Sequence, residues 1–183
     1  MINMALSQTI SGAPVTTKRP SIGRDLLTGA ISGQIAGFIM AVVMMIVFTL
    51  FLGKGPLYPV QVIGSFVFGD SALVGINGGA VVAGLLLHQL GPSLIWGVAF
   101  GALAWLLNVR HGAALFALGA IAGIASQIID VDLIVPAAFR AMQGHDIWAE
   151  NVPMVWSWAA HIVFGVSLAV YPKIYARLPA SKR

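Results

Sequence analysis

A single apolar stretch, residues 79–107, does most to limit what this chain can fold into. It reads GAVVAGLLLHQLGPSLIWGVAFGALAWLL, and it is long enough to cross a bilayer as a helix, which takes about 20 apolar residues. Its only ionisable side chain is His88. Because an ionisable group among lipid chains is costly, we expect His88 to face neighbouring helices, and we expect Pro92 to kink the helix close to it. The stretch therefore predicts a bundle of helices inside a membrane.

The composition agrees with a membrane protein and excludes several other classes. Hydrophobic residues make up 58% of the chain and charged residues only 9%, whereas about a quarter of a soluble domain is charged. The absence of cysteine excludes disulfides, thiolate metal sites and cysteine nucleophiles. The net charge of +4 comes from basic residues at the ends of apolar segments, so we expect a lipid bilayer as partner and not nucleic acid.

Apolar segments divide the chain into an all-α integral membrane domain, residues 26–172, and two tails. Four transmembrane helices are predicted, at residues 26–52, 79–107, 112–135 and 153–171. Residues 1–25 are predicted to be a polar cytoplasmic tail and residues 173–183 a basic one. The outer linkers, residues 54–78 and 136–151, mix apolar residues with glycine and proline, so we expect interfacial or re-entrant segments there.

The charged residues predict which side of the membrane each linker faces. With four spans, all lysines and arginines except Lys54 and Arg140 fall on the side of the termini. All acidic residues except Asp25 fall on the opposite side. Because basic residues near span ends are enriched in the cytoplasm, we predict a multi-pass protein with both termini cytoplasmic.

The first span begins with a series of small residues. Gly29, Gly33 and Gly37 follow the pattern GxxxGxxxG, which lines one face of a helix with glycine. Such a face allows another helix to approach closely. The sequence predicts a helix-packing face here, and it leaves open whether the partner is a helix of the same bundle or another subunit.

Each predicted span places a polar or soft side chain at a similar depth. His88 and His161 lie in spans two and four, Gln127 in span three, and Met44 and Met45 in span one. At a rise of 1.5 Å per residue, all lie roughly 12 Å below the outer ends of their spans. We therefore predict a polar layer in the outer leaflet.

Several roles for this layer remain open from the sequence. Neutral histidine both donates and accepts hydrogen bonds, so the layer can simply hold the helices together. Alternatively, His88 and His161 can ligate one b-type haem axially, with a copper site of histidine and methionine as a weaker variant. Together with Gln127 and Asp130, they can also form a proton or substrate path.

A group of carboxylates is predicted at the outer surface. Asp130 and Asp132 end the third span, and Asp146 and Glu150 follow in the next linker. Two positions apart on a helix, the first two point to different faces, so they do not predict a paired-acid catalyst. We expect solvated end charges, with an outer metal or partner site that includes His145 as the alternative.

Three segments carry a resemblance to known proteins. GAISGQIAGFIMAVVMM, LLLHQLGPSLIWGVAFG and AAHIVFGVSLAVYP resemble a group of small, uncharacterised four-helix bacterial inner-membrane proteins. That group has a glycine-rich first span and His-then-Gly motifs in spans two and four. The resemblance implies the architecture and the bacterial inner membrane as location, and it implies no activity.

The sequence contains no recognisable catalytic motif. A Walker A loop, GxSxG, HExxH and a Rossmann fingerprint are all absent, so we do not expect an enzyme. The leading hypothesis is a non-catalytic accessory subunit that packs against a larger energy-converting or redox membrane complex and requires no cofactor. The alternatives are a b-haem electron carrier that uses His88 and His161, and a small transporter or channel that uses the polar layer.

Overall fold

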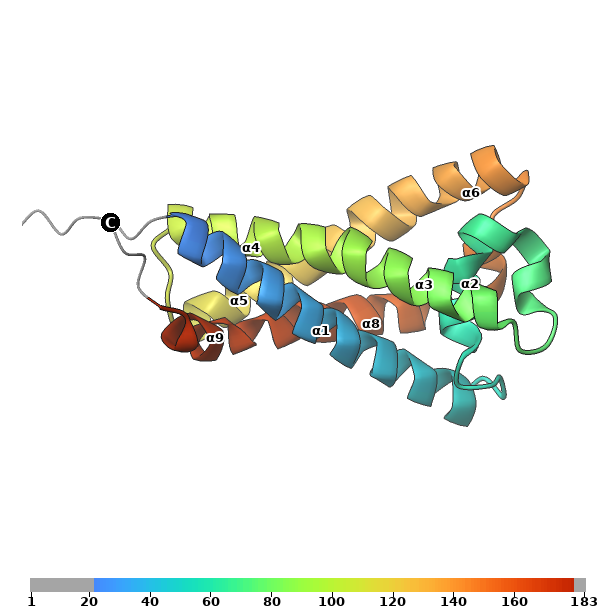
Figure 1. The fold of residues 1–183 in the computed structure, drawn as a ribbon, viewed down its shortest axis with the longest axis horizontal. Helices are drawn as coiled ribbons and strands as arrows, with labels where there is room; N and C mark the ends of the chain where they lie inside the picture. Colours follow the sequence, from blue (N-terminus) through green and yellow to red (C-terminus); the bar gives the residue numbers. More distant parts are fainter. Residues whose placement is uncertain (1–21, 180–183) are drawn as a thin grey trace, which may run out of the picture.

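The computed structural model describes residues 22–179. In that range every regular element is a helix. Four helices are long and apolar enough to cross a membrane, Ile22–Leu50, Gly78–Leu106, Ala113–Gln143 and Met154–Arg177 (Figure 1). These findings confirm the prediction of a helical bundle with four helices that could span a membrane. Most of the predicted N-terminal tail lies outside the described residues, as do Lys18, Arg19, Lys182 and Arg183.

The spans are built from several helical elements. The first span is α1 (Ile22–Leu50), and the second is α3 (Gly78–His88), η2 (Gln89–Ser93) and α4 (Leu94–Leu106). The third is α5 (Ala113–Ser126), η3 (Gln127–Ile134) and α6 (Val135–Gln143). The fourth is α8 (Met154–Ser167), η4 (Leu168–Val170) and α9 (Tyr171–Arg177). The linkers hold α2 (Tyr58–Phe68), η1 (Gly69–Leu73) and α7 (Ile147–Asn151).

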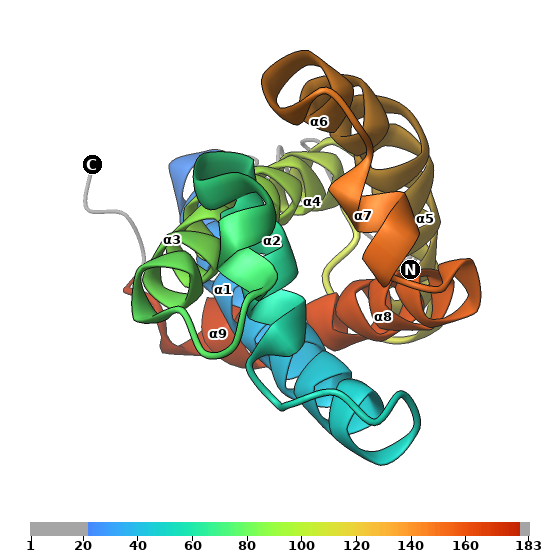
Figure 2. The ribbon, with the colours of Figure 1, turned by 90° about the vertical axis from the view of Figure 1, so that its right-hand side faces the viewer.

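The beginning of α1 and the end of α9 lie at the same end of the bundle (Figure 1). We call this the terminal end, and it also holds the short loop between α4 and α5. The opposite end, which we call the linker end, holds α2, α7 and the end of α6 (Figures 1 and 2). Because the chain crosses the bundle four times, the first and last described residues lie at the same end of it.

The glycine face of α1 packs against the second span of the same chain. A Cβ atom added to Gly29 would lie 2.7 Å from the Cα of Gly101, and one added to Gly33 would lie 2.7 Å from the Cα of Gly97. Gly37 faces the side chains of Ser93 and Gln89 in the same way. Of the two partners that the sequence left open for this face, the structure places the chain's own helix there.

A second glycine contact joins spans three and four. A Cβ atom added to Gly165 of α8 would lie 2.8 Å from the Cα of Gly123, and Gly119 faces the backbone of Gly165. The bundle is thus two closely packed helix pairs, α1 with the second span and α5 with α8. Packing of α1 against α8 then joins the two pairs.

The second and third spans each contain a π-helical turn close to a proline. Gly91 has non-helical angles (φ −88°, ψ −109°) within the π-helical turn η2, next to Pro92, which agrees with the predicted kink. The third span was predicted to end at residue 135, but its helix continues through Pro136 to Gln143. The N–H of Val135 bonds to the carbonyl of Asp130, five residues back. This π-helical turn accommodates the proline without a break.

The α2 helix covers the linker end. Gly64 of α2 packs against the backbone of Ala80, and Gly84 of α3 packs against that of Val60. On its other side α2 is joined to α6, because the Phe66 and Phe139 rings stack with centroids 3.8 Å apart. Figure 2 shows α2 in front of the bundle when it is viewed from this end.

A buried carboxylate joins three parts of the chain at the terminal end. Asp25, which was predicted to belong to a polar tail, is fully buried. Its Oδ1 lies 2.9 Å from Nη1 of Arg110 and accepts a hydrogen bond from the Tyr171 hydroxyl. Arg24 stacks on the Tyr175 ring, 3.9 Å from its centroid. The start of α1, the α4–α5 loop and the start of α9 are therefore held together by polar contacts.

Candidate functional site

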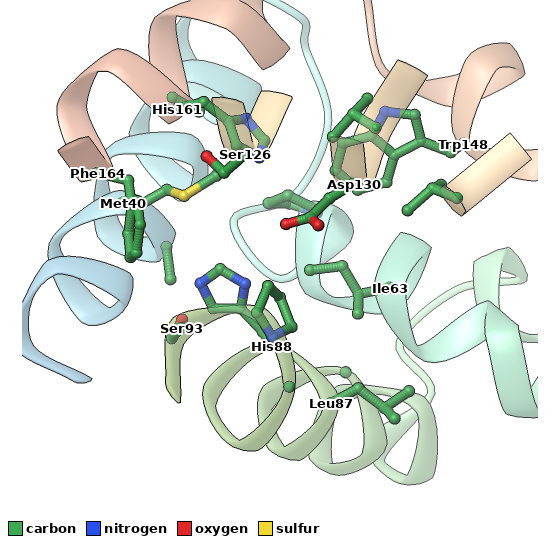
Figure 3. Close-up of a pocket in the computed structure, with 18 of the residues that line it drawn as sticks. Met40, Ile63, Leu87, His88, Ser93, Ser126, Asp130, Trp148, His161 and Phe164 are labelled. Carbon is green, nitrogen blue, oxygen red and sulfur yellow. The ribbon is translucent and has the colours of Figure 1, made fainter. Parts of the chain in front are cut away.

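A cavity of about 440 Å³ lies between the two helix pairs. Residues from α1, α2, α7 and α8 and from the second and third spans line it. In Figure 3, His88 and the Asp130 carboxylate reach toward one central space, with the sulfur of Met40 at its side. His161 lines the same cavity from α8. The two histidines that the sequence singled out therefore meet in one space.

Each of these histidines is held by one ring nitrogen. Nε2 of His88 lies 3.1 Å from the carbonyl oxygen of Gly37, and Nδ1 of His161 lies 2.9 Å from that of Ser157. A carbonyl only accepts, so these nitrogens carry the protons that are donated. Within residues 22–179, Nδ1 of His88 and Nε2 of His161 have no hydrogen-bond partner. In a neutral ring, each of these free nitrogens is an acceptor.

Asp130 belongs to the cavity and not to an outer acidic cluster. Its Oδ2 accepts a hydrogen bond of 2.7 Å from the indole Nε1 of Trp96, which links the third span to the second. Both residues line the cavity. The sequence carried a signal for each of them. An acid inside a long apolar helix is expected to face protein, and Trp96 lies eight positions after His88, on the same helix face.

The other members of the predicted polar layer do not share one environment, and Met45 is only half-buried. Met44 lines the cavity, whereas Gln127 and Met45 do not. Gln127 is fully buried. Its side chain accepts a hydrogen bond of 2.8 Å from the Ser157 hydroxyl and donates one of 2.9 Å to Asp132. Gln127 therefore ties the third span to the fourth and leaves no polar atom for a ligand.

The remaining predicted carboxylates also have separate partners. Asp146 caps α7 by accepting from the N–H of Ala149 and lies 3.5 Å from Arg140. Glu150 lies 2.8 Å from Nδ1 of His145. Asp132 and Asp146 line one small pocket together, but Asp130 lies in the cavity and Glu150 faces His145, so the four predicted carboxylates do not form one cluster. In the part of the chain that the structure describes, no group of three or more histidines and carboxylates could hold a metal ion.

His145 forms a separate contact at the linker end. Its Nε2 lies 3.3 Å from Asp70, which follows α2, while its Nδ1 faces Glu150 of α7. The hydrogen bond that the protonated ring donates to Glu150 is the main reason why the pKa of His145 is raised above its ordinary value, and the charge of Asp70 adds to it. This histidine therefore bridges two linkers when it is protonated.

The cavity wall is mostly apolar. Met40, Ile63, Val131 and Phe164 are among the side chains that form it. Of the described residues, neither a lysine nor an arginine lines it. The site therefore offers two imidazoles, one carboxylate and the unpartnered hydroxyl of Ser93 to a ligand whose other surroundings are mostly hydrocarbon. Comparison of the chain with protein-family models, with curated proteins and with solved structures found no match.

Proposed function

We propose that this protein is a non-enzymatic membrane protein that binds a small, largely apolar molecule in the cavity between its helix pairs. One observation carries the proposal: His88 and His161 are each fixed by one ring nitrogen, and each has a second nitrogen free in a common cavity. A cavity of about 440 Å³ falls in the range of sites for small ligands, roughly 300–1,000 Å³. An apolar wall with a few convergent polar groups is typical of such sites.

The location that we propose is the bacterial inner membrane, with the terminal end in the cytoplasm. Arg24, Arg110 and Lys173 support this orientation because they lie at the terminal end, where cytoplasmic basic residues would be expected. Asp70 and Glu150, by contrast, belong to the linker end. The resemblance of the spans to small inner-membrane proteins is the reason for choosing this membrane.

An accessory subunit of a larger energy-converting or redox membrane complex is a second proposal. The glycine face of α1 favoured this hypothesis in the sequence, but the second span of the same chain packs against that face. The polar N-terminal tail also favoured it, and most of that tail lies outside the described residues. The absence of catalytic motifs agrees equally well with a binding protein. A native gel of the protein from mild detergent tests this hypothesis, because an accessory subunit should migrate with a larger complex.

The b-haem hypothesis draws on the same two histidines. A histidine that ligates a metal commonly donates its other N–H to a carbonyl, as both do here. The free nitrogens differ, however, being Nδ1 in His88 and Nε2 in His161. An absorption spectrum of protein expressed with haem available decides the matter. A Soret band would favour haem, and its absence would remove haem as the ligand.

Extraction of the purified protein tests the proposed function directly. The protein is purified in mild detergent, extracted with organic solvent, and the extract is analysed by mass spectrometry. We expect one apolar small molecule in near-stoichiometric amount, and we expect it to be depleted in the His88→Leu, His161→Leu double variant.

His111→Leu is the matched control, because His111 lies in the exposed α4–α5 loop and should leave the extract unchanged. Thermal unfolding of each variant shows whether the fold is retained. A wild-type extract that contains only the bulk membrane lipids, in bulk proportions, would contradict the proposed function.

A further inference from the structure

We infer that the cavity opens sideways to the bilayer, and that its ligand is an uncharged lipid-phase molecule with a hydroxyl or carbonyl head group and an apolar tail. Prenylated quinones and quinols have this chemistry. The inference rests on the proposed function. It adds the path by which the ligand enters the cavity and the chemical class of the ligand.

The opening lies between the second span and α6. Residues that line the cavity and are also exposed on the outer surface mark its edges. Ile95 and Leu87 form the edge on the second span, with exposed fractions of 64% and 41%, and Ile134 forms the opposite edge with 53%. Ala138, one turn beyond Ile134, also lines the cavity. Figure 1 shows α6 diverging from α3 toward the linker end.

Two contacts set the height of this opening. Toward the terminal end, the hydrogen bond from Trp96 to Asp130 joins the second span to the third. Toward the linker end, α2 joins α6 through the stacked Phe66 and Phe139 rings and through the hydrogen bond from Gln143 to the Phe66 carbonyl. Between these two contacts, the edge residues named above are all apolar. The opening is thus a window with four sides.

The position of the window favours access from lipid over access from water. Its edges belong to helices that are long and apolar enough to span a membrane, and the second span is the least buried of the four. An exposed apolar edge in such a helix contacts hydrocarbon. A molecule that is dissolved in the bilayer would reach the cavity without crossing a polar surface.

The polar groups in the cavity restrict the head group. A phosphate or carboxylate head would lie near the carboxylate of Asp130, and neither lysine nor arginine is available among the described lining residues to neutralise it. The free nitrogens of His88 and His161 and the oxygens of Asp130 accept hydrogen bonds, so they suit a hydroxyl group that donates. The hydroxyl of Ser93, which lines the cavity and has no partner, can donate to a carbonyl group. The apolar wall and the window accommodate a tail that extends toward the lipid.

Two probes with and without a tail test the route and the class together. Decyl-chain benzoquinone and its tail-less parent are titrated into protein in nanodiscs, and quenching of tryptophan fluorescence reports binding, since Trp96 and Trp148 line the cavity. The variant Ala138→Phe narrows the window. Ala137→Phe is the matched control, because the neighbouring Ala137 is exposed and does not line the cavity.

We expect Ala138→Phe to weaken binding of the decyl probe by about tenfold, which corresponds to the lost burial of about two methylene groups. Binding of the tail-less probe should not change, and this also shows that the variant is folded. Equal binding of the decyl probe by both variants would overturn the window and leave the proposed function standing. Failure of the wild type to bind either probe would overturn the ligand class, while the solvent extraction decides the proposed function separately.

Discussion

His145 is the residue whose ionisation should be felt most directly at the linker end. It lies between Asp70 and Glu150, and its pKa is raised chiefly by the hydrogen bond with Glu150. A pKa that is raised in the folded state means that the contact stabilises the fold fully below the ordinary value of 6.5. This contribution is lost as the pH rises through the raised value.

The expected result is faster hydrogen exchange in α7 and in the residues after α2 as the pH rises from 6 to 8.5, after correction for the intrinsic rate. Mass spectrometry of the corresponding peptides measures it. The variant His145→Gln should remove this pH dependence. A wild-type protein with pH-independent protection in both segments would show that the histidine does not hold them together.

At the scale of helices, glycine decides how closely the spans approach. The contact between α1 and α4 brings backbone against backbone, because Gly33 and Gly97 have no side chains to separate them. In a membrane, where helix association depends on close packing, such contacts are a main source of stability. The same arrangement recurs between α5 and α8.

Substitution of Gly33 by alanine should therefore destabilise the bundle. The new Cβ atom would lie 2.7 Å from the Cα of Gly97, and the helices would have to separate. We expect a loss of about 1–3 kcal/mol in the free energy of unfolding, measured by titration with denaturing detergent. Gly23→Ala is the control in the same helix, because no heavy atom lies within 4 Å of its added Cβ. Equal stability of the two variants would mean that α1 and α4 are loosely packed at Gly33 and Gly97.

At the scale of the molecule, we predict that the linker end faces away from the cytoplasm. The chain contains no cysteine, so single cysteines can be introduced without background. Ser71→Cys places one at the linker end and His111→Cys one at the terminal end, both at exposed positions. The distribution of basic residues leads us to expect that a membrane-impermeant maleimide labels only Ser71→Cys in intact cells. Labelling of only His111→Cys would reverse the orientation.

The four spans could be predicted because each is a long apolar run, a property of the local sequence. The third span is an exception. Proline usually ends a helix, so Pro136 predicted the end of this span, and no local pattern predicts the π-helical turn that lets the helix continue through it. The site was predicted in part. His88 and His161 stood out as ionisable groups within spans. Asp130 was expected mainly at the outer surface because it lies near the predicted end of the third span, and its hydrogen bond with Trp96, 34 positions away, was not predicted. Partners distant in sequence come from packing, which no local pattern records.

The contacts of Asp25 have a consequence for the order in which the chain is assembled. Tyr171 donates to this carboxylate across 146 positions of sequence, and Arg110 is supplied midway between them. When the first helix enters the membrane during synthesis, its acid has neither partner. Arg110 is synthesised directly after the second span, in the α4–α5 loop, and Tyr171 only at the start of α9. A chain that stops before its last helix therefore lacks the hydrogen bond from Tyr171 to the buried acid of its first helix, and this missing contact distinguishes an unfinished product from a finished one.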